Sequence, residues 1–125
     1  MVYFSEPFVG GFFGFGRTYG AVVRLECSSI AVLESDWPAA LQQTNQWRQT
    51  RNDRASVLHL YLQVPKSAVP EAISFVADRI LVAPTSMPEV FRGLCLEVNI
   101  FTPEMEHYMH LVLCPDLKGA PNVLI

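Results

Sequence analysis

In residues 56–64, Ser-Val-Leu-His-Leu-Tyr-Leu-Gln-Val, aliphatic and other side chains alternate from Leu58 to Val64. Leucine or valine occupies every second position, whereas His59, Tyr61 and Gln63 lie between them. A period of two residues is that of a β-strand with one buried face. The pattern therefore predicts a strand over 56–64 whose other face carries polar and aromatic groups.

Three further segments, at about 21–33, 94–101 and 107–114, have the same period and are predicted strands. The last two form a hairpin in which only pairings with an odd sum keep the aliphatic sets on one face. The central choice sets Leu96 opposite Leu113 and leaves a loop of about four residues, a common hairpin length. On the opposite face this register pairs Cys95 with Cys114, Glu97 with Val112, Asn99 with His110 and Phe101 with Tyr108.

Two helices are predicted, near 37–50 and 68–82, because apolar residues recur there at helical spacing. Ser35 or Asp36 can cap the first helix, which places Pro38 in its tolerant first turn. Ser67 can cap the second. Its apolar stripe consists of Val69, Ile73, Val76 and Ile80. A short helix over about 87–92 is expected to close at Gly93.

The order of these elements predicts one α+β domain over residues 1–125. We expect a two-layer sandwich with a mostly antiparallel sheet and two helices on one face, since the strands alternate and are not continuously apolar. In general shape this resembles the ferredoxin-like plait or a related topology. Residues 1–20 are expected to form a glycine- and aromatic-rich hairpin segment, and 115–125 an extended tail.

The segment Phe-Val-Gly-Gly-Phe-Phe-Gly-Phe-Gly-Arg-Thr-Tyr-Gly, residues 8–20, holds five of the chain's seven glycines. A dinucleotide fingerprint needs glycines at G-x-G-x-x-G before a helix, but here Tyr19 takes the third position and a strand follows. We therefore expect no nucleotide and no other cofactor. The glycines permit tight turns and bulges. The aromatic side chains assigned to binding in this segment are Phe12, Phe13, Phe15 and Tyr19.

Composition narrows the class of partner. The chain has 17% charged residues and a net charge of −3, which gives no electrostatic attraction to nucleic acid or anionic lipid. No basic leader precedes the first apolar residues and no run of 18 apolar residues occurs, so no membrane contact and a cytoplasmic location are expected. Cys27, Cys95 and Cys114 lack metal-site spacing and are expected to be thiols, with the last two close enough to crosslink.

The predicted face opposite the helices gathers the candidate functional residues. We expect a non-catalytic intracellular binding or adaptor domain that contacts a second copy of itself, as a homodimer, or an unknown protein partner. The alternative is a small-molecule-binding protein or enzyme with a pocket at His110, His59 and Glu97, one histidine acting as general base. No metal site is expected. The contact residues proposed on this face are Tyr61, Asn99, Phe101 and Tyr108.

Overall fold

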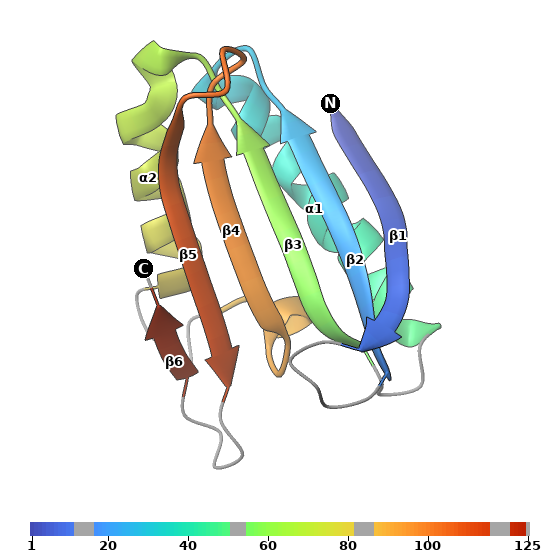
Figure 1. Cartoon of the computed structure of the whole chain (residues 1–125). Coiled ribbons are helices and arrows are strands. Elements are labelled where there is room, and N and C mark those ends of the chain that lie inside the picture. Colours follow the sequence, from blue (N-terminus) through green and yellow to red (C-terminus); the bar gives the residue numbers. More distant parts are fainter. Residues whose placement is uncertain (12–16, 51–54, 82–86, 116–120, 125) are drawn as a thin grey trace.

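The computed structural model describes residues 1–11, 17–50, 55–81, 87–115 and 121–124. Six strands form one sheet in the order β1-β2-β3-β4-β5-β6, and the helices lie behind it in Figure 1. The strands are β1 (Val2–Gly11), β2 (Arg17–Glu26), β3 (Ala55–Gln63), β4 (Cys95–Phe101), β5 (His107–Pro115) and β6 (Pro121–Leu124). The helical elements are α1 (Ile30–Gln49), η1 (Lys66–Ala68), α2 (Val69–Val76), η2 (Ala77–Leu81) and η4 (Glu89–Phe91).

The sheet is mixed, with a parallel centre and antiparallel flanks. β2 pairs with β3 and β3 with β4 in parallel, because a helical connection returns the chain to the same end of the sheet each time. β1, β5 and β6 each add antiparallel to a neighbour. The expected α+β class with two helices on one sheet is confirmed, but the sheet is not purely antiparallel. The ferredoxin-like order is not confirmed. In that fold the helix of each βαβ unit joins two strands that are not neighbours, whereas here β2 and β3, and β3 and β4, are neighbours in the sheet.

Helix α1 begins seven residues earlier than the sequence predicted. β2 ends at Glu26, and Ser29 caps the helix by accepting a hydrogen bond from the backbone N–H of Val32 at 3.3 Å. The strand predicted over 21–33 was therefore wrong beyond Glu26, and the caps predicted at Ser35 or Asp36 were also wrong. Pro38 lies inside the helix and not in its first turn. Packing of the helix outweighs the local cost of about 3 kcal/mol of an interior proline.

The second helical segment lies where it was expected, but it is irregular. A 3₁₀ turn, η1, leads into α2, and the π-helical turn η2 follows. No side-chain cap is present at the start of η1 or α2, so the predicted cap by Ser67 was wrong. Val69, Val76 and Ile80 are buried as predicted, whereas Ile73 is 37% exposed. η4 and the positive φ of 81° at Gly93 agree with the short helix expected there.

The β4–β5 hairpin has the predicted register over most of its length. Leu96 faces Leu113, Glu97 faces Val112, Val98 faces Leu111 and Asn99 faces His110. A bulge between Ile100 and Phe101 then sets Phe101 opposite His107, so the predicted pair with Tyr108 was wrong. Bulges depend on local backbone geometry, which the alternation of side chains does not reveal.

The N-terminal hairpin is formed by β1 and β2. β2 is one continuous strand, so the second arm of the hairpin and the predicted strand that follows it are the same element. A register shift between Ser5 and Phe8 interrupts β1 next to Pro7. At the other edge, β6 has four residues within the segment expected as an extended tail.

The core lies between the sheet and the helices. Leu58, Leu60 and Leu62 of β3 are at most 1% exposed, and the aliphatic positions of β2 and β4 flank them. From the helices, Trp37 packs edge-to-face on Phe75 with ring centroids 5.1 Å apart. Within the described ranges, no helix has the length and apolar character needed to cross a bilayer.

A matched pair of isoleucines tests this assignment of the core. Ile80→Ala removes a side chain that is 2% exposed and should lower the free energy of unfolding by about 2–5 kcal/mol. Ile73→Ala, in the same helical segment but 37% exposed, should change it by less than about 1 kcal/mol. Urea unfolding followed by circular dichroism measures both. Equal losses would mean that the helix packs on the sheet by a different face.

Candidate binding face

The face of the sheet opposite the helices, here called the open face, carries two rows of side chains across four strands. Strand register fixes these rows, because residues paired across neighbouring strands point to the same side. One row consists of Val22, His59, Glu97 and Val112. The next consists of Arg24, Tyr61, Asn99 and His110. The residues predicted to share a face on β2 to β5 are thus brought together.

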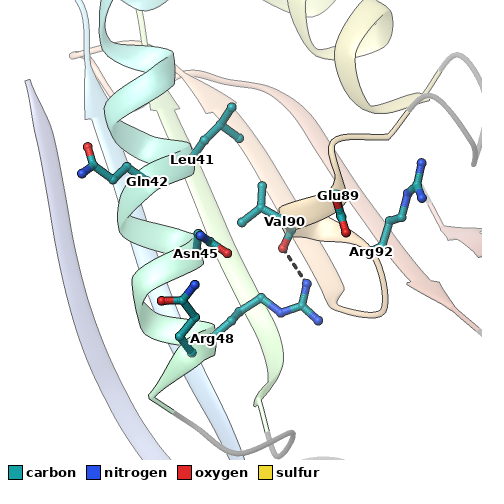
Figure 2. Close-up of a pocket in the computed structure, with 8 residues that line it drawn as sticks. Leu41, Gln42, Asn45, Arg48, Glu89, Val90 and Arg92 are labelled. Atoms are coloured by element: carbon teal, nitrogen blue, oxygen red, sulfur yellow. Dashed lines mark hydrogen bonds between the residues drawn. The ribbon is translucent and has the colours of Figure 1, made fainter.

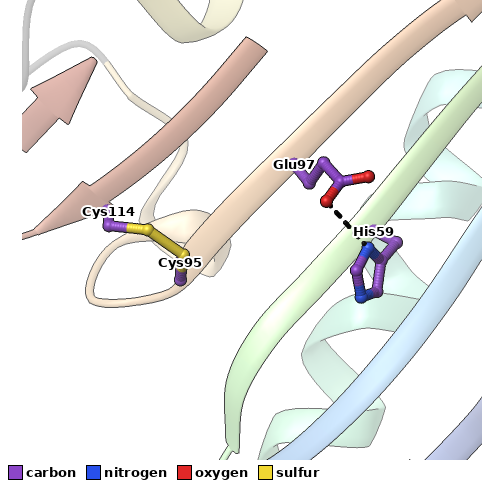
Figure 3. Close-up of a disulfide and its surroundings, with 4 residues drawn as sticks. All are labelled: His59, Cys95, Glu97 and Cys114. Carbon is purple, nitrogen blue, oxygen red and sulfur yellow. Dashed lines mark ion pairs between the residues drawn. A yellow bond between two sulfur atoms is a disulfide. The ribbon is translucent and has the colours of Figure 1, made fainter. Parts of the chain in front are cut away.

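Glu97 is the centre of a polar cluster on the open face. Its Oε2 lies 3.5 Å from Nδ1 of His59, and its Oε1 lies 3.8 Å from Nε2 of His110. Figure 3 shows His59 and Glu97 pointing toward each other from adjacent strands. The His59 side chain is 13% exposed and that of His110 is 50% exposed. One carboxylate therefore holds a mostly buried histidine on one side and an accessible histidine on the other.

Asn99 extends the cluster toward the end of the sheet. Its Nδ2 donates to Oε1 of Glu97 at 3.0 Å, and its Oδ1 lies 2.9 Å from Nε2 of His107. An amide oxygen can only accept, so this contact requires a proton on Nε2 of His107. Asn99 is 7% exposed, and both ends of its amide are bonded. Alternation along 107–114 would put His107 and His110 on opposite faces of one strand, but the bulge turns His107 onto the open face.

An aromatic cluster lies beside the polar one. The ring of Tyr61 stacks on His59 at 6.4 Å and meets Phe101 edge-to-face at 6.3 Å. The guanidinium of Arg24 lies over the Phe101 ring, with Cζ 5.4 Å from the centroid. Burial raises the pKa of Tyr61, and the Glu97 carboxylate raises it further while Arg24 opposes the shift. The Tyr61 hydroxyl is therefore a neutral hydrogen-bond donor at physiological pH.

A pocket of about 270 Å³ opens where these clusters meet the β4–β5 turn. Buried Thr102 holds the turn: its carbonyl accepts from the N–H of Met105 and its hydroxyl accepts from the N–H of Glu106. Met105 has a positive φ of 66°, a conformation that costs a non-glycine residue about 1–2 kcal/mol, and its side chain is 71% exposed. The residues lining the pocket are Val22, Arg24, Tyr61, Asn99, Phe101, Met105 and His107.

Cys95 and Cys114 form a disulfide between β4 and β5, with Cα atoms 4.1 Å apart (Figure 3). The predicted position of this pair is confirmed. The expectation of two thiols was wrong, because it assumed a reducing compartment, which the spacing of the cysteines in the sequence cannot establish. Burial raises the pKa of the remaining thiol, Cys27, to about 11. Cys27 is consequently protonated and unreactive at physiological pH.

A second, wider hollow of about 870 Å³ lies on the helical side, between α1 and η4. Figure 2 shows Arg48 reaching across it, where Nη1 donates to the carbonyl of Val90 at 2.7 Å. Leu41 and three amide side chains line much of the rest. Arg48 here ties a helix to a loop, and none of the candidate residues predicted from the sequence lines this hollow.

Some predicted contact residues are not part of the cluster. Phe12, Phe13 and Phe15 lie outside the described residues, and for Tyr19 only the backbone, in β2, is described. Tyr108 is 39% exposed beside the bulge, and its hydroxyl donates to Oε2 of Glu106 at 2.7 Å. The residues that sequence reasoning missed are Val22, Met105 and His107. Alternation marks Val22 as a residue of the open face, but no sequence signal marked the other two.

Among the described residues, no group of three or more His, Cys, Asp or Glu side chains could hold a metal ion. Ser5 pairs with Val22 and so lies two strands from His59, about 10 Å at the usual strand spacing, too far for a nucleophile and its base. The chain matches no protein-family model, no curated protein and no solved structure. Its function is therefore inferred from the geometry of this face.

Titration of Tyr61 tests the charges around it. Glu97→Gln should lower the pKa of Tyr61, because it removes a neighbouring negative charge, and Arg24→Gln should raise it. The Cζ chemical shift of labelled tyrosine, followed against pH, measures both. A raised pKa gives stability that is present below pH 10.0 and lost as the pH rises through the folded value, so Tyr61→Phe should reduce the alkaline loss. Glu71→Gln, on α2, should have no effect on the Tyr61 pKa.

The disulfide predicts a defined pattern of alkylation. Unfolded, unreduced protein should take up one iodoacetamide label, on Cys27, and reduced protein three. The double variant Cys95→Ser and Cys114→Ser should lose about 3 kcal/mol of unfolding free energy, since the bridge joins residues 19 positions apart. Mass spectrometry and urea unfolding give the two results. Three labels without reductant would mean that the cysteines are thiols.

Proposed function

We propose that this chain is a non-catalytic binding domain that forms a homodimer through its open face. The observation that carries the proposal is the unequal covering of the sheet. Helices α1 and α2 cover one face, whereas no element that the structure describes lies over the rows on the other. Tyr3, which pairs with Arg24, and Met105 add exposed apolar surface at the margins of this face.

The edges of the sheet are poor sites for a partner strand. β1 is interrupted by a register shift next to Pro7, and proline and bulges are devices that block strand addition. β6 has only four residues and begins with Pro121. A partner strand would thus meet an interrupted edge at β1 and, on the other side, an edge divided between β6 and the part of β5 before Val112, which favours docking on the face.

Composition favours a second copy as the partner. Only 17% of the residues are charged, below the 25% that is usual for soluble domains, and 50% are hydrophobic. In a symmetric dimer the same patch of each subunit forms the contact. A patch with apolar and polar groups can therefore be covered by the identical patch of a second copy. The proposed contact is a two-fold pairing of open faces around Tyr61 and His110.

A second candidate function is supported by the convergence of His59 and His110 on Glu97. A carboxylate beside an imidazole orients the ring, an arrangement that suits a general acid or base acting on a small molecule. A hydrolytic assay with p-nitrophenyl acetate compares the wild type with Glu97→Gln. Activity above that of free imidazole, lost in the variant, would favour this candidate over a binding domain.

Sedimentation velocity at micromolar concentration tests the dimer. The wild type should sediment as a dimer, and Tyr3→Asp and His110→Asp, two exposed positions on the open face, should each shift it toward the monomer. A charge placed in the contact would lose its hydration without gaining a partner of opposite charge. Ile73→Asp, on the exposed side of α2, is the matched control and should leave the dimer intact.

Two results would contradict this proposal. A wild-type monomer at high concentration would refute self-association, and a dimer broken only by Ile73→Asp would place the interface on the helical side. The cytoplasmic location remains a prediction. A disulfide that persists in unreduced native protein would favour an oxidising compartment instead.

A further inference from the structure

The pocket beside the β4–β5 turn combines an aromatic wall with one cation. Tyr61 and Phe101 meet edge-to-face, and Val22 and Met105 supply aliphatic surface. The volume, about 270 Å³, lies just below the range of about 300–1,000 Å³ that holds drug-sized ligands. A ligand with a single ring is the size that this pocket can enclose.

Arg24 is the polar group with hydrogen-bonding capacity left over. Among the residues that the structure describes, its Nε has no hydrogen-bond acceptor, and Oε1 of Glu26 lies 3.9 Å away. Stacking over Phe101 holds the planar guanidinium at the pocket, with its side chain 42% exposed. A guanidinium presents paired N–H donors that match a carboxylate.

The other polar groups of the pocket are already engaged or neutral. Asn99 is bonded at both ends, to Glu97 and to His107. The charge of Glu97 faces His59, His110 and the Asn99 amide, so it is turned toward its own partners. Tyr61 can donate one hydrogen bond from its hydroxyl. Arg24 is therefore the cation that the pocket offers to a ligand, and it lies next to the apolar wall.

We propose that this pocket binds a small aromatic carboxylate, with its ring against Tyr61, Phe101 and Met105 and its carboxylate on the guanidinium of Arg24. Edge-to-face contacts with the two rings hold the ligand ring. The exposed thioether of Met105 closes over its edge, a contact that sulfur makes favourably with aromatic rings. All of these residues belong to one chain. Because Tyr61 also lies in the proposed dimer contact, the dimer would cover the pocket and the ligand would compete with the second copy.

Phenylacetate is the probe, and backbone amide NMR shifts measure its binding. We expect millimolar affinity, with shifts confined to residues around Tyr61, Phe101 and Met105. Phenylacetamide, which lacks the charge, and acetate, which lacks the ring, should each bind at least about tenfold more weakly, the effect of losing one charge-assisted hydrogen bond or the ring contacts.

Single substitutions test whether the charge of Arg24 contributes to ligand binding in a protein that remains folded. Arg24→Gln should weaken phenylacetate binding about tenfold, while Glu26→Gln should strengthen it by removing a competing carboxylate. Arg79→Gln is the matched control, since Arg79 also stacks on a phenylalanine ring, Phe75, but on the helical side. It should bind as the wild type does. Well-dispersed amide spectra establish that each variant is folded.

Three outcomes would overturn the proposal: equal affinity for phenylacetate and phenylacetamide, unchanged binding in folded Arg24→Gln, or the absence of shifts at the pocket at saturating probe. Each is measured on the wild type and on Tyr3→Asp, which the sedimentation test expects to be a monomer, because the proposed dimer would cover Tyr61. Failure of the pocket and failure of the dimer are therefore distinguishable.

Discussion

The structure depends on the burial of alternate aliphatic side chains of β2, β3 and β4 beneath two helices. In β3, Leu58, Leu60 and Leu62 are sealed against the helical layer. Because successive side chains of a strand point to opposite faces, this burial forces His59 and Tyr61 onto the open face. A shift of one residue in any strand would place the polar row in the core, so the same packing that stabilises the fold also sets the position of the candidate site.

Within the open face, Glu97 organises the polar groups. A carboxylate withdrawn from water needs hydrogen bonds or charge partners, and Glu97 has the Asn99 amide and two histidines. These contacts fix Asn99, which in turn orients His107. The cluster thus satisfies itself internally. That arrangement is the basis of the binding surface proposed above.

The pocket depends on local features that the regular sheet would not provide. The bulge between Ile100 and Phe101 shifts the end of β4, and the turn anchored by Thr102 carries Met105 to the pocket. Met105 holds a left-handed backbone conformation that glycine adopts more readily. Such conformations persist when the surrounding structure holds them and are found at ligand sites. Strain at this turn and the unsatisfied Nε of Arg24 meet in the same pocket.

The sequence by itself determined the strand faces and most of the hairpin register. Each strand can bury only one of its two alternating sets of side chains. Burial of the leucine sets therefore predicted, without knowledge of strand order, one shared face for His59, Tyr61, Glu97 and Asn99. It did not reveal that the central strands are parallel. Parallel strands usually read as continuous apolar runs because helices cover both faces, but here one face is open and the strands alternate like antiparallel ones.

Only the tertiary structure decided the start of α1, the position of His107 and the contents of the pocket. Pro38 indicated a helix beginning near it, yet packing of Leu33 and Trp37 on the sheet extends the helix back to Ser29. His107 reaches the open face through a bulge, which has no side-chain signature. The physical reason is common to all three: periodicity records which side of an element is buried, whereas the start of a helix, a bulge and a pocket depend on backbone geometry and packing that periodicity does not encode.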